Sequence, residues 1–365
     1  MVKSRDHVFR VRTGMVIFAS LLLFLANQPG LTQADGIVIT SLDWHPDGET
    51  IAIGYGVLID NRRSCRSGYF FDEEVHLYNI STNVMNVISR PEPTCSVNSV
   101  QFSDDGQFIL TSSESIEIYN LSTSERINGL GGPILFVSAY WSPNEDEILI
   151  NGLAASFIQD SLDFTQTRLI FSPPEIPGSV QFIESLWNYN GRNIATITND
   201  IVSLSSSAYI WDANNGDILT IFSGYPATAM SGAWHPEDNI VATGYSDGLI
   251  VIWDAITGQI VRQLDGHSDA VYDLDWSPIG SQLASASKDR TVRIWDWQTS
   301  EMQVLDNSRV FTSVAYSRDG LQLAYGGQVT DATSPAISVV AHPMVIPIPS
   351  PTPTPTPTQA TGTSD

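Results

Sequence analysis

One segment of the chain matches the nucleophile motif of α/β hydrolases. Gly244, Ser246 and Gly248 fit the pattern G-x-S-x-G, in which a turn between a strand and a helix exposes the serine hydroxyl. The segment aligns with a second turn of the chain at residues 286–291, and no helical pattern follows it. We therefore predict a turn between two strands here and no catalytic serine.

Several short polar segments carry side chains of the types that bind metal ions. His45 and His235 each precede a proline, and residues 104–106, 144–146 and 212–217 are rich in Asp, Asn or Gly. Calcium sites use such oxygens, but none of these segments has the ligand spacing of an EF-hand loop. Asp, Asn and Gly also supply the backbone geometry of turns. The sequence therefore predicts turns, no metal site and no cofactor.

The first 34 residues predict export. Four basic residues flank an uncharged apolar run at residues 15–26, which is shorter than the roughly 20 residues that span a bilayer. Ala34 is a small residue, and we expect cleavage of a signal peptide before Asp35. The mature protein would be secreted, periplasmic or at the cell surface, with no transmembrane span. An uncleaved membrane anchor is the alternative.

The acidity of the chain limits its partners. The net charge is −23, and removing residues 1–34 takes away four basic residues and one acid, which leaves −26. Such a surface repels phosphate backbones and anionic membranes. We expect no nucleic-acid partner, and instead one that is neutral, cationic or metal-bearing.

The chain has two cysteines, Cys65 and Cys95, and no Cys/His cluster of the zinc-binding type. In an oxidising compartment such a pair can persist as a disulfide. At the other end, residues 350–365 are rich in Pro and Thr and cannot bury a core. We predict a Cys65–Cys95 bond and a disordered tail that follows one folded domain at residues 35–349.

The elements that must position these residues form a repeat. An aromatic residue followed by a polar or proline-containing corner recurs, and we call it the anchor of each copy. The anchors are Trp44, Phe102, Trp141, Trp187, Trp234, Trp276 and Tyr316. They lie 58, 39, 46, 47, 42 and 40 residues apart, and a period near 40 is typical of a four-stranded propeller blade. Evenly spaced short strands with Gly/Asp/Asn turns favour the same all-β fold, a seven-bladed β-propeller of four-stranded antiparallel blades.

The sixth copy shows what family this repeat resembles. It contains Gly266-His267, Trp276-Ser277-Pro278 and a strand that ends in Trp295-Asp296. These are marks of the WD40 family, to which residues 37–341 are similar. The resemblance implies that each anchor lies on the innermost strand. It also implies that His267, Ser285, Asp289 and Trp295 form a hydrogen-bonded network with a structural role.

In such a ring, His45 and His235 belong to blades 1 and 5, three steps apart, so they cannot share an ion. We predict both as corner residues with exposed rings. The loops that enter each blade and those between second and third strands would share one face, the top face. The long insertions at residues 56–74, 152–167, 200–207 and 328–334 are all expected there. Ring closure is expected through an outer edge at residues 344–349.

The predicted function is the binding of a protein, peptide or glycan at the top face. WD40 relatives often contact partners four residues before each anchor, where this chain has Thr40, Asn98, Val137, Ile183, Met230, Tyr272 and Thr312. Tyr272 and Met230 are the strongest candidates, although packing alone could explain Val137 and Ile183. Tyr69, Phe70 and Phe71 in the insertion at residues 56–74, pinned by the disulfide, form a second candidate contact.

Two alternatives differ in class. Exported propellers of other families place catalytic carboxylates around the central channel, and glycoside hydrolysis needs two carboxyl groups about 5 to 10 Å apart. Glu184 and Asp273 are expected near the channel, although nothing in the sequence marks them as a pair. A purely structural envelope component is the other alternative. We favour a binding module without enzymatic activity.

Overall fold

The computed structural model describes residues 36–58, 74–89, 97–113, 115–131, 136–152, 155–161, 167–171, 180–200, 202–237, 239–328 and 337–341. The predicted signal peptide and the Pro/Thr-rich tail lie outside the described residues, as do Cys65, Cys95, Tyr69, Phe70 and Phe71. All elements of the described part are strands, and it contains no helix of the length and apolarity that crossing a membrane requires.

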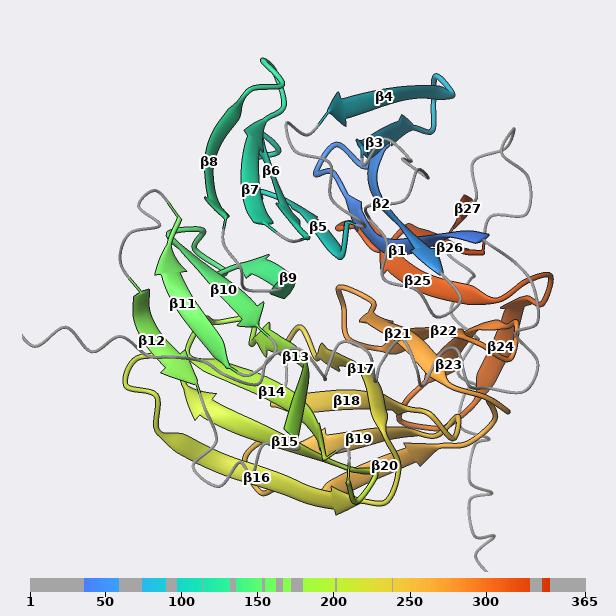
Figure 1. The fold of residues 1–365 in the computed structure, drawn as a ribbon. Helices are drawn as coiled ribbons and strands as arrows, with labels where there is room; N and C mark the ends of the chain where they lie inside the picture. The colour runs from blue at the N-terminus through green and yellow to red at the C-terminus, as the bar shows by residue number, and fades with distance from the viewer. Residues whose placement is uncertain are drawn as a thin grey trace, which may run out of the picture.

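The strands form seven antiparallel sheets arranged around a centre, and each sheet is a blade (Figure 1). Blade 1 comprises β1 (Gly36–Trp44), β2 (Thr50–Leu58), β3 (Glu74–Asn79) and β4 (Val84–Ser89); blade 2 comprises β5 (Ser99–Phe102), β6 (Phe108–Ser112), β7 (Ser115–Asn120) and β8 (Arg126–Gly131). Blade 3 comprises β9 (Phe136–Trp141), β10 (Glu147–Gly152), β11 (Ser156–Asp160) and β12 (Thr167–Phe171); blade 4 comprises β13 (Val180–Trp187), β14 (Asn193–Asp200), β15 (Ser205–Asp212) and β16 (Ile218–Tyr225).

The remaining blades continue the order. Blade 5 comprises β17 (Ala229–Trp234), β18 (Ile240–Tyr245), β19 (Ile250–Asp254) and β20 (Ile260–Leu264); blade 6 comprises β21 (Val271–Trp276), β22 (Gln282–Ser287), β23 (Val292–Asp296) and β24 (Met302–Asp306); blade 7 comprises β25 (Phe311–Tyr316), β26 (Gln322–Gly327) and β27 (Ile337–Ala341). Strands follow chain order within every sheet, and the first strand lies innermost. The predicted seven-bladed propeller is confirmed, and each anchor ends its innermost strand.

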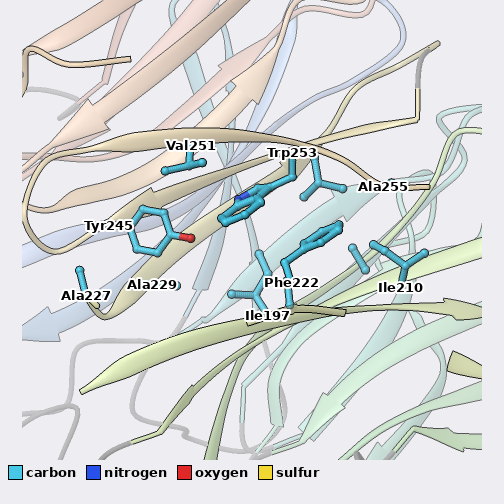
Figure 2. Packing of buried hydrophobic residues seen from close by; sticks show 12 residues of the cluster. Ile197, Ile210, Phe222, Ala227, Ala229, Tyr245, Val251, Trp253 and Ala255 are labelled. Atoms are coloured by element: carbon cyan, nitrogen blue, oxygen red, sulfur yellow. The ribbon is translucent and has the colours of Figure 1, made fainter. Parts of the chain in front are cut away.

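The core lies between neighbouring blades because each sheet buries both of its faces. Between blades 4 and 5, Ile197 and Ile210 pack with Phe222, and the ring of Phe222 stacks on Trp253 with 5.3 Å between centroids (Figure 2). The burial pattern of β22 shows the same feature, since all six of its residues are buried. Two-sided burial explains why apolar or small residues occupy successive positions of the second strands, with serines and an alanine neighbouring one another in β22, instead of exposed polar residues at every second position.

The strand turns define two faces of the ring. We call bottom face the one with the turns from first to second and from third to fourth strand. The top face carries the chain segments that enter each blade and the connections from second to third strand. Residues 59–73, between β2 and β3, lie outside the described residues, so the position of the insertion expected at residues 56–74 stays a prediction.

Two of the other predicted insertions are corrected. Residues 152–167 contain β11, which pairs with β10 and is the third strand of blade 3. Gln159 pairs with Ile148 and is buried, at the position where Trp253 pairs with Val241 in blade 5. The third strands of most other repeats were recognised by an aromatic residue near their end. Because Gln159 takes that place here, the sequence did not predict this strand.

In blade 4 the expected loop at residues 200–207 is a long hairpin instead. Its strands β14 and β15 remain paired up to Asp200 and Ser205. The insertion predicted at residues 328–334 falls, apart from Gln328, outside the described residues, and so does the closing edge predicted at residues 344–349.

Blades 1 and 7 are joined by contacts of their inner strands. The indole N–H of Trp44 donates to the Ala315 carbonyl at 2.9 Å. Val38, near the start of β1, forms a bridge with Gln328, just beyond the end of β26. These contacts bring the first and last blades side by side (Figure 1).

Candidate functional site

The seven residues predicted to contact a partner gather at the top ends of the innermost strands. Six of them are the unpaired residue of a register shift between first and second strand, whereas Asn98 precedes β5. The six are Thr40, Val137, Ile183, Met230, Tyr272 and Thr312. A β-bulge frees a residue from the regular ladder and redirects its side chain. The predicted positions therefore share one local backbone geometry.

Four of the seven positions have a structural contact. The Thr40 hydroxyl donates to the Val97 carbonyl, and the Thr312 hydroxyl donates to the Ile39 carbonyl at 2.5 Å, so each joins its blade to the next. Ile183 packs against the core between blades 4 and 5. The fourth residue, Asn98, donates its backbone N–H to Ser112 at 2.7 Å.

Met230 and Tyr272 differ from these four. Both are half-buried, and both lie outside the core clusters of the described residues. They belong to the neighbouring blades 5 and 6, and β17 and β21 lie next to each other in Figure 1. The accessible part of the predicted site is thus centred on these two side chains.

Polar side chains on several innermost strands bond to the backbone of the next blade. The residue before the anchor accepts the backbone N–H of the next anchor in three places. Asp43 accepts from Phe102 at 2.6 Å, Gln101 from Trp141 at 2.8 Å, and Asp275 from Tyr316 at 2.6 Å. These donors belong to strand edges that face the channel and have no neighbouring strand, so they need such acceptors.

A second set of acceptors lies three residues before the anchor. Ser41 accepts the N–H of Val100 at 3.2 Å, Ser99 that of Ala139 at 3.1 Å, Glu184 that of Gly232 at 3.0 Å, and Asp273 that of Val314 at 2.9 Å. In each pair the acceptor belongs to the preceding blade. Together the two sets of acceptors join blade 1 to 2, blade 2 to 3, blade 4 to 5 and blade 6 to 7.

The acidic members of this wall have raised pKa values. Burial raises the pKa of Asp43 and Asp273 to about 6, that of Glu184 to about 7 and that of Asp275 to about 8. The charge of Asp273 adds to the effect on both Glu184 and Asp275. Tyr140 donates its hydroxyl to Glu184 at 2.6 Å. Near neutral pH these carboxyl groups are therefore partly protonated.

Glu184 and Asp273, the pair considered for glycoside hydrolysis, are confirmed on innermost strands, β13 and β21. Each is engaged by protein donors. Besides the N–H of Val314, Asp273 accepts the hydroxyl of Ser313 at 3.0 Å, and Glu184 accepts Tyr140 and Gly232. These hydrogen bonds between neighbouring blades account for the positions of Glu184 and Asp273 in the channel wall.

The predicted exposure is wrong for His235, and His45 is only partly exposed. His235 is buried; its Nε2 donates to the Gly280 carbonyl at 2.9 Å, and its Nδ1 accepts the N–H of Glu237 at 3.2 Å. His45 repeats this with Gly106 at 3.0 Å and Asp47 at 3.1 Å. In both cases a Cβ on the glycine would overlap the imidazole, so only glycine lets the ring reach the next blade. The glycine that each histidine contacts is distant in sequence, so the corner motif alone could not predict how deeply the ring is buried.

The four-residue network of blade 6 has the predicted hydrogen bonds. Trp295 Nε1 donates to Ser285 Oγ at 2.8 Å, Ser285 Oγ lies 2.7 Å from His267 Nε2, and His267 Nδ1 lies 2.8 Å from Asp289 Oδ2. Because a carboxylate only accepts, His267 donates from Nδ1 and accepts at Nε2. Burial lowers the pKa of His267, which keeps the ring neutral.

The remaining motifs are turns. Residues 246–249 connect β18 to β19, and Gly248 donates its N–H to the Tyr245 carbonyl at 3.2 Å, so Ser246 lies in a strand-to-strand turn. The Asp105 carboxylate accepts the N–H of Gln107 within its own turn at 2.8 Å. In the part of the chain that the structure describes, no group of three or more His, Cys, Asp or Glu side chains could hold a metal ion.

Comparison with protein families matches three segments. The family model of the WD domain, G-beta repeat, matches residues 86–116 and 258–296, and that of the anaphase-promoting complex subunit 4 WD40 domain matches residues 218–276. These matches cover parts of blades 1 and 2 and of blades 4 to 6. No curated protein matches the chain.

Proposed function

Because the chain belongs to the WD40-repeat propeller family, whose members are typically non-enzymatic interaction scaffolds, we propose that it binds a protein partner through its top face. The bulged residues at the top ends of the innermost strands carry this proposal. Among the bulged residues whose side chains the structure describes, Met230 and Tyr272 are large, half-buried and in none of the core clusters. Large half-exposed side chains of these types are typical anchors of interfaces.

The Tyr272 hydroxyl stays protonated at neutral pH. Burial, followed by the charge of Asp269, raises its pKa far above the ordinary value. It therefore offers a neutral donor and an aromatic face, whereas Met230 offers an adaptable apolar side chain. Such a pair suits a partner with an apolar anchor, which also agrees with the exclusion of anionic partners by the net charge of −23.

We expect replacement of both Met230 and Tyr272 by Ala to weaken partner binding by about 1 to 3 kcal/mol without unfolding the ring. Partners would be isolated by cross-linking from the native envelope, and their affinities for purified wild-type and variant protein then measured by calorimetry. Leu321→Ala is the control, because Leu321 is 62% exposed on the bottom face. Unchanged affinity in the folded double variant would place the site elsewhere.

An extracytoplasmic location belongs to the same proposal. It is supported by the basic and apolar composition of residues 1–34 and by the two cysteines. Cys65 falls in the connection from β2 to β3, and Cys95 falls in the connection from β4 to β5. Both connections belong to the top face, so a bond would pin the segment with Tyr69, Phe70 and Phe71 near the proposed site.

Peptide mapping of the native protein without reduction tests both features. We expect a mature N-terminus between about residues 27 and 35 and a peptide that contains Cys65 linked to Cys95. Mapping after reduction provides the matched control, since the linked peptide should then separate. Intact Met1 in a cytoplasmic fraction, or free thiols at both positions, would contradict the location.

A further inference from the structure

A polar hollow lies on the bottom face between blades 3 and 4, far along the strands from the proposed protein site. Its volume is about 570 Å³. It is formed by three turns, β9–β10, β13–β14 and β15–β16. The side chains used in the following argument are Asn144, Asp146, Trp187, Tyr189, Asn190 and Asn214.

The two blades are in contact at this seam. Pro143 packs over Gly191, where an added Cβ would lie 3.4 Å from the proline ring. Gly191 has a φ of +69°, a turn conformation that side chains other than glycine rarely adopt. The hollow is therefore bounded by turns with a fixed backbone.

The lining has aromatic rings and uncharged amides, with no Lys or Arg among its described residues. Tyr189 is 47% exposed, so much of its side chain is free to contact a ligand. Asn144, Asn190 and Asn214 are exposed as well. Asp146 adds an acceptor. With neither Lys nor Arg in it, the hollow does not suit phosphate, sulfate or carboxylate ligands.

Trp187 supplies a donor without an acceptor. Its indole N–H is buried and makes no hydrogen bond to the described residues, whereas the anchors Trp44 and Trp276 donate to Ala315 and Ala233 of the preceding blade. At the corresponding position blade 3 has Tyr140, whose larger side chain replaces the alanine. This N–H has almost no accessible surface, so Trp187 contributes the accessible part of its ring to the hollow, and its indole signal can report on binding there.

We propose that this hollow binds a neutral saccharide. A sugar hydroxyl both donates and accepts, which matches amide side chains that do the same, and vicinal hydroxyls can share one carboxylate. The apolar C–H face of a pyranose ring fits the exposed face of Tyr189. The carboxylates of Asp146 and Glu147 also line the hollow, so a cationic peptide is the competing ligand, and the test below includes one.

The proposal is independent of the top-face site, and nuclear magnetic resonance of the full-length ¹⁵N-labelled mature protein tests it. The probes are cellobiose, maltose, xylobiose, chitobiose and mannobiose, each added to millimolar concentration. The indole N–H signal of Trp187, identified by its loss in Trp187→Phe, should shift with at least one probe. The signals of Trp141 and Trp234 should not, because these indoles also lack a partner among the described residues but do not line the hollow.

Variants separate this site from unspecific binding. Tyr189→Ala and Asn144→Ala should each weaken the titration by about tenfold, because both side chains are exposed and their loss leaves the core intact. Ile279→Ala, at a 66% exposed position of the equivalent turn in blade 6, should bind as the wild type does.

Three outcomes would overturn the proposal. One is the absence of a Trp187 shift with all five probes, and another is wild-type affinity in both Tyr189→Ala and Asn144→Ala. The third is a shift with trilysine and with no saccharide, which would assign the hollow to cationic peptides instead.

Discussion

The free energy of unfolding is expected to be higher at about pH 5 than at about pH 8.5, by several kcal/mol, because of four carboxyl groups in the channel wall. Burial raises the pKa of Asp43, Glu184, Asp273 and Asp275 in the folded state. Above about pH 8 the folded protein must hold all four charges. As the pH falls towards 5, it binds protons that the unfolded chain does not yet bind, and stability rises.

Other groups set the limits of this window. Burial lowers the pKa of His267, so this residue opposes the trend once the pH falls below about 6.5. The effect of this single histidine on stability is expected to be smaller than the combined effect of the four carboxyl groups. Backbone hydrogen bonds from Gln107 and Thr257 lower the pKa of Asp105 and Asp254, and the stability they contribute is lost in more acidic solution, through their folded pKa values. Stability should therefore pass through a maximum in mildly acidic solution.

Asp275 should contribute most, because its pKa reaches about 8. Asp275→Asn retains an acceptor for the N–H of Tyr316 but no longer titrates, so the difference in unfolding free energy between about pH 5 and 8.5 should shrink by a few kcal/mol. The Asp275 side chain is partly exposed, and solvent in the channel limits the size of this change in unfolding free energy. Asp254→Asn, which removes an equal charge from an exposed turn, is the control. Urea unfolding at several pH values measures the slope, and equal slopes in both variants would contradict the prediction.

The second large effect is expected in blade 6, where Asp289→Ala should cost about 3 to 5 kcal/mol of stability. The Asp289 side chain is 2% exposed, and it bonds His267 at 2.8 Å and Arg293 at 3.4 Å. Its Oδ1 also accepts the N–H of Thr291 at 2.9 Å. Removing the carboxylate leaves a buried imidazole and a guanidinium without that partner.

Blade 5 provides the matched comparison. Asp247 occupies the equivalent turn but is exposed, and Tyr225, which stands in the place of His267, reaches it only at 3.5 Å. Asp247→Ala should therefore cost less than about 1 kcal/mol. Denaturant unfolding of the two variants at the same pH measures the difference. Equal losses would show that the network of blade 6 adds no stability beyond that of an ordinary turn aspartate.

The sequence predicted the ring because its pattern is local and repeated. Each anchor, turn and apolar second strand lies within one copy, and a similar pattern returns about every 40 residues. Where the local pattern changes, prediction fails. β11 was missed because Gln159 stands in place of an aromatic residue.

Contacts between blades were harder to foresee, since the partners lie about 40 to 60 residues apart. The burial of His235 depends on Gly280, and that of His45 depends on Gly106. The candidate residues were chosen by family resemblance, and the structure has them at the top ends of the innermost strands. Nothing in the sequence showed that those residues form bulges, or that Thr40 and Thr312 are engaged by neighbouring backbone.

The side-chain acceptors of the channel wall have a consequence for how the propeller can hold a peptide. Extended peptides often bind proteins by β-augmentation, in which they add as a new strand to an exposed sheet edge. On four innermost strands, β5, β9, β17 and β25, inward N–H groups that such a strand would need are already bonded, namely those of Val100, Phe102, Ala139, Trp141, Gly232, Val314 and Tyr316. At these strands a segment that enters the channel would bind mainly through its side chains, so binding there will depend on the sequence of the peptide.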